Sequence, residues 1–149
     1  MNLKKVLTEI VKKWIDEKED SLRITRYKDK IGVTVDGFIL FMFDDFEFPF
    51  DYEKLNRGGK EFYMKSFIEV SRNAVKLTKT NTLRKLQHCT CIEFKFEDDR
   101  EPIYVNERFI KYFNAKCEFR GLDYKSLVYV YEDNKFVGAI MPVRIRGGE

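Results

Sequence analysis

The sequence has few of the residues that mark several common classes of protein. Its 149 residues include three cysteines, three prolines, one histidine and one tryptophan. An odd and small number of cysteines favours reduced thiols in a cytoplasm over the disulfide framework of a small secreted domain. No apolar run approaches the roughly 20 residues that a membrane-spanning helix needs, and the N-terminal segment lacks the uncharged apolar stretch of a secretory signal. We therefore expect a cytoplasmic protein without a membrane partner.

The motifs of the common enzyme classes are also missing. The sequence contains no glycine-rich phosphate loop, no His-Glu-x-x-His helix and no Gly-x-Ser-x-Gly turn around a nucleophile. The single histidine, His88, limits acid–base chemistry near neutral pH. We therefore expect a binding protein that is not an enzyme and that needs no cofactor or metal.

The overall composition predicts one domain, residues 1–149, with one core. The chain is 44% hydrophobic and 36% charged, and a chain of this length buries roughly two thirds of its unfolded surface. The net charge of +3 is small, but its distribution is uneven. Residues 36–53 contain six acids and no Lys or Arg, whereas residues 54–86 contain nine basic residues and two acids.

The beginning of the sequence predicts a helix and three strands. Apolar residues recur between residues 3 and 15 at the spacing of a helix, with lysines on the other side. Residues 22–35 alternate between apolar and polar side chains in two stretches joined by a turn near Asp29. A second turn is expected at Asp36-Gly37, a dipeptide suited to positive φ, before an apolar strand over residues 38–43.

The middle of the sequence is harder to interpret. Residues 46–52 alternate aromatic and polar side chains around Pro49, which predicts an edge strand or an extended loop. Residues 56–60 are rich in glycine and predict a loop. Residues 62–86 combine an imperfect helical pattern with threonines typical of strands, so both structures remain open.

The end of the sequence repeats the order of the beginning. Strands are expected at residues 90–96 and 103–105, and Asn106 is suited to cap a short helix. A strand at 117–121 and a hairpin over 127–145, turning at 133–135, follow. The predicted fold class is α+β, with two helix-plus-antiparallel-strands halves over about residues 1–60 and 85–146.

Two parts of the sequence resemble the bacterial DNA sliding clamp, the β subunit of DNA polymerase III. Residues 103–113 form a strand that ends at the Asn106 cap of a helix, and a Met-Pro-Val-Arg-Ile run at 141–145 closes the last apolar strand. Their order and spacing are similar to the closing half-domain of the clamp, and residues 26–41 resemble an early clamp hairpin. Clamps carry three such domains in each chain, whereas this chain has the length of one.

The resemblance implies a single clamp-like module, with two helices on a curved antiparallel sheet, that acts without catalysis in DNA replication or repair. It implies a protein or peptide partner, double-stranded DNA and further copies of the chain as candidate partners. A small protein of this type is expected to be encoded by a phage or another mobile element. The implied partner-peptide pocket is formed by Met141, Pro142, Val143 and Arg144, and the implied DNA-facing residues are Lys4, Lys5, Lys12 and Lys13. The same residues also fit a closing strand and a solvated helix face.

The uneven charge supports a second class of function. The acidic, aromatic segment has carboxylates that could engage a basic surface of a host nucleic-acid enzyme, as an inhibitory effector would. These acids are Asp44, Asp45, Glu47 and Asp51. They also fit a segment with buried rings and solvated acids. The basic stretch 54–86 fits phosphate contacts, a solvated face or an internal match with the acidic segment.

Two further patterns have the residue types of a catalytic site and of a metal site. Glu93-x-Lys95 on a strand, with Asp44 or Asp45 upstream, has the residue types of a metal-dependent nuclease, but it is also the ordinary pattern of a solvated strand face. His88, Cys89, Cys91 and Cys117 are candidate zinc ligands without a second paired spacing, so reduced structural cysteines are favoured.

Overall fold

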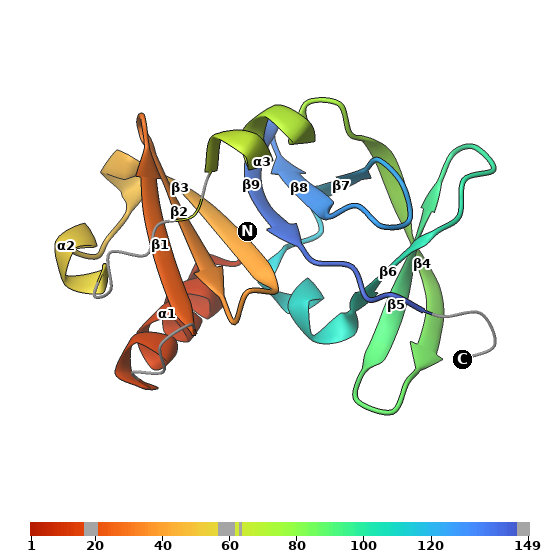
Figure 1. Ribbon diagram of the computed structural model, residues 1–149, viewed down its shortest axis with the longest axis horizontal. Coiled ribbons are helices and arrows are strands. Elements are labelled where there is room, and N and C mark those ends of the chain that lie inside the picture. The colour runs from red at the N-terminus through yellow and green to blue at the C-terminus, as the bar shows by residue number, and fades with distance from the viewer. Residues whose placement is uncertain (17–20, 57–61, 63, 146–149) are drawn as a thin grey trace.

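The computed structural model describes residues 1–16, 21–56, 62 and 64–145, and it shows an α+β fold. A single nine-stranded antiparallel sheet runs through the molecule, with helices packed on it (Figure 1). The first half contains α1 (Leu3–Asp16), β1 (Leu22–Tyr27), β2 (Lys30–Val35), β3 (Ile39–Asp44), the 3₁₀ turn η1 (Asp45–Glu47) and α2 (Tyr52–Leu55). The second half contains α3 (Met64–Ser71), β4 (Val75–Lys85), β5 (Thr90–Phe96), β6 (Ile103–Asn106), η2 (Glu107–Tyr112), β7 (Glu118–Gly121), β8 (Val128–Glu132) and β9 (Lys135–Ile140).

Six of the nine strands form two matching runs of three within the sheet. The order is β1-β2-β3-β9-β8-β7-β4-β5-β6, so β3 and β9 meet where two runs of three strands join. Each run follows a helical segment, α1 before β1–β3 and η2 before β7–β9. The long hairpin of β4 and β5, together with β6, extends the sheet beyond the second run.

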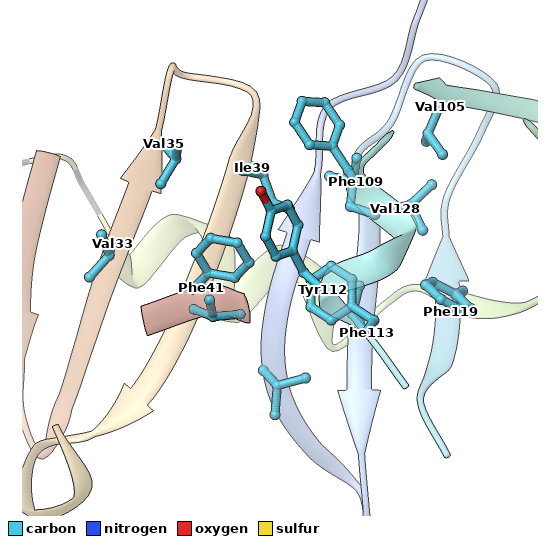
Figure 2. Close-up of a cluster of buried hydrophobic side chains, with 14 of the residues drawn as sticks. Val33, Val35, Ile39, Phe41, Val105, Phe109, Tyr112, Phe113, Phe119 and Val128 are labelled. Carbon is cyan, nitrogen blue, oxygen red and sulfur yellow. The ribbon is translucent and has the colours of Figure 1, made fainter. Parts of the chain in front are cut away.

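One main core lies between the sheet and the pair formed by α1 and η2. Val6 and Ile10 of α1 belong to the same buried cluster as Phe109, Tyr112 and Phe113 at η2. Figure 2 shows these η2 aromatic rings among side chains from β2, β3, β6, β7 and β8. Because both helical segments share this cluster, they cover the same face of the sheet.

A smaller cluster on the sheet packs under α3. Met64 of α3 lies with Leu40, Met42, Tyr129 and Tyr131. The Tyr131 hydroxyl donates to Ser71 Oγ at 2.8 Å, which ties the end of α3 to β8. Strand β3 contributes to both clusters, so all six of its residues are buried, as an apolar run in a covered strand predicts.

The tight turns agree with the sequence. Asp36 and Gly37 have φ of 53° and 71°, and Asp133 and Asn134 have φ of 52° and 63°. Positive φ at both central residues matches the twist of the flanking strands, which explains why Asp, Asn and Gly stand there. The hairpins of β2 with β3 and of β8 with β9 therefore have the predicted positions.

The structure specifies three segments further than the sequence does, and for two of them it decides between the alternatives left open. The Asn106-capped segment is a 3₁₀ helix of six residues. Residues 46–52 form no strand, because η1 begins the segment and Asp51 caps α2 at its end. Residues 62–86 resolve into α3 and the eleven-residue strand β4. The predicted loop at 56–60 lies, apart from Asn56, outside the described residues.

The last strand is also shorter than expected. Strand β9 ends at Ile140, and the chain then crosses toward β6. Met141 N donates to the Phe38 carbonyl at 2.8 Å, whereas Val143 N donates to the Tyr104 carbonyl at 2.7 Å. Pro142 has no N–H and forms only an isolated bridge with Val105. The C-terminal segment therefore lies against the far edge strand of the sheet.

None of the helices in the described ranges has the length and apolar character that crossing a bilayer requires.

Candidate binding surfaces

Helical segments α1 and η2 are joined directly. Asn2 N donates to the Tyr112 carbonyl at 2.7 Å. Asparagine side chains cap both segments, because Asn2 Oδ1 accepts from Lys5 N at 3.3 Å and Asn106 Oδ1 accepts from Arg108 N at 3.0 Å. Burial raises the pKa of the Tyr112 hydroxyl to about 12, so this hydroxyl is neutral at physiological pH.

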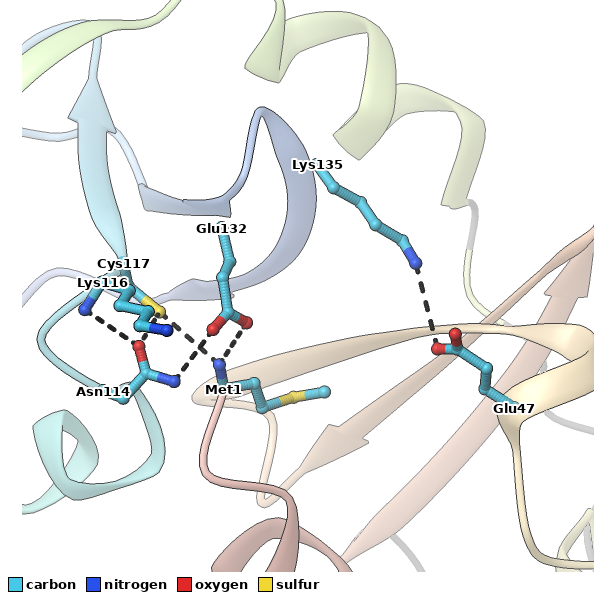
Figure 3. A network of polar contacts seen from close by, with 7 residues as sticks. All are labelled: Met1, Glu47, Asn114, Lys116, Cys117, Glu132 and Lys135. Atoms are coloured by element: carbon cyan, nitrogen blue, oxygen red, sulfur yellow. Dashed lines mark hydrogen bonds and ion pairs between the residues drawn. The ribbon is translucent and has the colours of Figure 1, made fainter.

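The N-terminus adds a polar link between the same two halves. Glu132, at the end of β8, accepts from the Met1 ammonium and, at 2.9 Å, from Asn114 Nδ2 (Figure 3). These hydrogen bonds lower the pKa of the Glu132 carboxyl, and the contact with the ammonium makes the larger contribution. The paired helices are thus held at their ends by hydrogen bonds as well as by the core.

Three of the four lysines predicted to face DNA lie on the open side of α1. Lys4, Lys5 and Lys12 are exposed. Lys13 is diverted into the fold, because its Nζ lies 2.9 Å from Asp36 Oδ2 at the turn between β2 and β3. The hydrogen bond with Asp36 raises the pKa of the Lys13 ammonium. Lys13 therefore fixes the helix to a hairpin and is a poorer candidate for a phosphate contact.

The structure adds two basic residues that sequence reasoning did not single out. Arg108 and Lys111 of η2 are exposed on the helical segment beside α1. The Arg108 guanidinium lies 4.6 Å from the centre of the Phe109 ring, and Lys111 Nζ lies 5.1 Å from that of Tyr112. Both could have been identified from the sequence, because they occupy the polar positions of the short helix predicted after Asn106. We call Lys4, Lys5, Lys12, Arg108 and Lys111 the helix-pair face.

The residues predicted to form a peptide pocket lie on a partly open segment. Met141 is 43% exposed, Arg144 is exposed, and Pro142 and Val143 are half-buried beside β6. The backbone contacts with Phe38 and Tyr104 hold this segment in place. The three hollows described below have other linings. The segment therefore offers exposed apolar atoms on a backbone that hydrogen bonds hold in place.

Most of the predicted acidic interaction residues are engaged within the chain. Asp44 is nearly buried and bonds with Lys30 of β2 and Lys135 of β9. These hydrogen bonds, with the one from Lys135 the stronger, lower the pKa of the Asp44 carboxyl. Asp45 Oδ1 lies 3.3 Å from Arg26 Nη2.

The other two acids have local contacts. Asp51 Oδ1 accepts from the backbone N–H groups of Glu53 and Lys54, as a helix cap does. Glu47 Oε2 lies 4.0 Å from Lys135 Nζ, a contact drawn in Figure 3. Asp44 and Asp51 therefore have structural roles, whereas Asp45 and Glu47 keep more of their carboxylates in solvent.

The candidate nuclease residues are brought together only in part, because Lys95 Nζ lies 3.9 Å from Glu93 Oε1 but Asp44 lies elsewhere. Glu93 of β5 is buried and accepts from Thr80 Oγ1 at 3.1 Å and from the Tyr104 hydroxyl at 3.0 Å. Asp44 lies instead at the end of β3, where Lys30 and Lys135 bond with it. The described residues contain no group of three or more acids, cysteines or histidines spaced to hold a metal ion. The arrangement gives Glu93 a structural role in the β4–β6 sheet.

Two of the three cysteines lie close together, and the third has other neighbours. Cys89 and Cys91 have sulfur atoms 3.7 Å apart, and all three cysteines are free thiols. Burial raises the pKa of Cys91 to about 12 and also raises that of Cys117. Cys117 lies beside Asn114 and the Met1 ammonium. The described residues contain no cluster of three or more candidate metal ligands that includes these cysteines.

The basic stretch contributes Lys76 and Lys79 to a groove where β4 and β7 meet. Lys76, Lys79 and Lys116 line a groove of about 770 Å³ between β4, η2 and β7, and Leu77 and Phe113 lie beside them. A second hollow, of about 330 Å³, lies between the β1–β2 turn and α3. A third, of about 180 Å³, lies between α1 and α2 and is lined mostly by apolar side chains.

The chain matches no protein-family model, no curated protein and no solved structure.

Proposed function

We propose that this protein is a non-catalytic, sliding-clamp-like module that binds double-stranded DNA in replication or repair. The helix-pair face carries the proposal. Two halves of one antiparallel sheet each place a capped helical segment on the same face of the sheet, and the two segments together carry five exposed basic residues. Two adjacent helices with basic outer positions fit a surface that follows a phosphate backbone without reading bases.

The basic residues on this face remain available for a ligand. No ion pair joins Lys4, Lys5, Lys12 or Lys111 to another described residue at the distances that define one. The acids nearest in sequence are Glu9, Asp16 and Glu107, so the face is basic but not uniformly so. We expect weak binding by one copy, because few phosphates are contacted at once, and strong dependence on salt.

A matched pair of charge variants tests the proposal. Lys5→Glu/Lys12→Glu changes the helix-pair face, and Lys85→Glu/Lys125→Glu makes the same change of charge at exposed lysines on β4 and the β7–β8 loop. Fluorescence anisotropy with a short DNA duplex, between about 50 and 200 mM salt, measures affinity and its salt slope. We expect the first variant to lose at least about tenfold in affinity and to reduce the slope by about two.

The control variant should keep most of the affinity and the original slope at this site. Equal losses in both variants would mean that net charge alone attracts DNA. No binding of the wild-type protein at the lowest salt would remove the proposal altogether.

The C-terminal segment is the proposed surface for a partner peptide. Its support is the exposed Met141 side chain beside the half-buried Pro142 and Val143, since methionine adapts to varied apolar anchors. Met141→Asp should leave the free energy of unfolding within about 0.5 kcal/mol of wild type, as expected for an exposed position. A loss of several kcal/mol in a urea titration would instead make Met141 a core residue.

The alternative, an effector that blocks a host nucleic-acid enzyme through the acidic segment, has less support. Asp44 and Asp51 are engaged by Lys30, Lys135 and the start of α2, so fewer carboxylates than expected remain free to meet a basic partner.

A further inference from the structure

The groove between β4, η2 and β7 forms where two strands separate. Strand β4 pairs with β7 only from Val75 to Leu77, and then continues along β5 as far as Lys85. The backbone edge of β4 that faces β7 is therefore unpaired beyond Leu77, and η2 closes one side of the space. A groove of about 770 Å³ is within the usual range of ligand and peptide sites, about 300–1,000 Å³.

The groove is lined by apolar side chains and by three lysines. Lys76, Lys79 and Lys116 line it, and no ion pair joins any of them to another described residue. The acid in the lining, Glu118, already bonds with Arg120 at 2.7 Å through the guanidinium Nε. The complementary occupant is therefore an apolar group flanked by carboxylates.

The described part of the chain presents such a group at η1. Phe46 is 83% exposed, the highest value among its large apolar side chains, and it stands between Asp45 and Glu47. The side chains of these two acids are 43% and 57% exposed. Their contacts with Arg26 and Lys135 are surface ion pairs, which contribute little to stability and exchange readily for another partner.

The two surfaces lie on different parts of the molecule. Segment η1 directly precedes α2, which Figure 1 shows at one end, whereas β4 lies toward the other end. One copy therefore cannot fill its own groove through a local movement of η1. A contact between different surfaces of two copies is heterologous, and repetition produces a ring if the rotation closes or an open chain if it does not.

We propose that copies of this chain associate head to tail, with Phe46, Asp45 and Glu47 of one copy seated in the Lys76–Lys79–Lys116 groove of the next. The inference goes beyond DNA binding, because neither surface belongs to the helix-pair face. It also gives a one-domain chain a route to the multi-domain assembly that encircling DNA would need.

Complementation between two variants tests the proposal. Phe46→Asp removes the apolar anchor, and Lys76→Glu/Lys79→Glu reverses the charge of the groove. Sedimentation velocity should show concentration-dependent association of the wild-type protein and monomers for each variant alone. An equimolar mixture should form a dimer and no larger species, because one variant keeps its groove and the other keeps its Phe46.

Matched substitutions control for general effects. Leu83→Ser removes an exposed apolar side chain from β4, and Lys85→Glu/Lys125→Glu reverses two exposed charges. None of these residues lines the groove. Both controls should associate as wild type does. Circular dichroism should show the same fold in every variant, since all the substituted side chains are exposed.

Three results would overturn the inference. The first is a wild-type protein that stays monomeric up to about 100 µM, a concentration at which contacts of micromolar affinity are populated. The second is association of the single variants to the same extent as the wild type. The third is an equimolar mixture that stays monomeric. The DNA proposal fails separately. The Lys5→Glu/Lys12→Glu variant should associate normally while losing DNA, and the groove variants should keep the DNA affinity of a single copy.

Discussion

The two halves of the sheet place a helical segment on the same face, but they build that segment differently. In the first half, α1 has 14 residues and buries the aliphatic side chains of Val6 and Ile10. In the second half, η2 has six residues and is followed at once by Phe113, so that three aromatic rings lie within five residues. Because a buried aromatic ring covers more area than an aliphatic side chain, a short turn can cover the same core as a longer helix.

The difference also shows where the halves depend on one another. Phe41, from the first half, packs edge-on to Tyr112 at 5.2 Å between ring centres and lies 6.1 Å from Phe113, both from the second half. Figure 2 shows the three rings side by side across the junction of the two halves. The halves resemble each other in element order, but they share one core and should unfold together.

Truncating the ring at this junction should have the largest effect. Phe41 is fully buried, and Phe41→Ala should lower the free energy of unfolding by about 3–5 kcal/mol. Phe46→Ala, which removes the same atoms at an exposed position, should change it by less than about 0.5 kcal/mol. Urea unfolding followed by circular dichroism measures both. Two separate transitions in the Phe41 variant would show that the halves are independent units.

Removing the charge that links β2, β3 and β9 should have the next largest effect. Asp44 bonds with Lys30 and Lys135 across these strands. Asp44→Asn should cost about 1.5–3 kcal/mol at pH 7, the usual range for hydrogen bonds to a charged group.

The effect of Asp44→Asn should depend on pH in a defined direction. The pKa of Asp44 is lowered in the folded protein, so its contribution is present above the unfolded pKa of about 3.9 and is lost as pH falls through the folded pKa. The wild-type and variant proteins should therefore converge in stability in acid. Unfolding midpoints that diverge as pH falls below about 4 would contradict this assignment.

Replacing one glycine by alanine in each half should show how strongly the loss of stability depends on whether the neighbouring atom can move. A Cβ at Gly138 of β9 would lie 2.5 Å from the Leu40 carbonyl oxygen, and a Cβ at Gly32 of β2 would lie 2.6 Å from Met64 Sδ. The carbonyl belongs to the paired backbone of β3, whereas the thioether can move. We expect Gly138→Ala to cost about 1–3 kcal/mol and Gly32→Ala clearly less. Equal losses in thermal unfolding would mean that both sites are equally rigid.

Local signals explain what the sequence predicts well. Asp36-Gly37 and Asp133-Asn134 define their turns through backbone preference alone, and Asn106 marks its helix start through its side chain. The α+β class and the order of helices and strands at both ends of the chain follow from such signals together with apolar periodicity. They need no knowledge of which strands become neighbours.

Contacts between distant segments explain what sequence reasoning missed. In the sequence, Lys13 looks like Lys12, another polar position of the helix. The two differ in the structure because the β2–β3 turn approaches α1 and places Asp36 beside Lys13. Val143 is not part of the last strand, because its N–H donates to the Tyr104 carbonyl of the edge strand β6. The basic groove forms because β4 pairs with β7 only over a few residues and then separates from it. No local pattern in residues 62–86 predicts which strand β4 pairs with or where that pairing ends.

The asparagine caps offer the smallest and most direct comparison of the two halves. The Asn106 cap has a bond of 3.0 Å and the Asn2 cap one of 3.3 Å. We expect Asn106→Ala to cost about 1 kcal/mol and Asn2→Ala about 0.5 kcal/mol, because the shorter bond is stronger and the short η2 has fewer other hydrogen bonds to hold it. Asn81→Ala, at an exposed position of β4, is the control and should be neutral. The opposite order, with the lower urea midpoint for Asn2→Ala, would contradict this prediction. It would show that α1 depends more on its asparagine cap than η2 does.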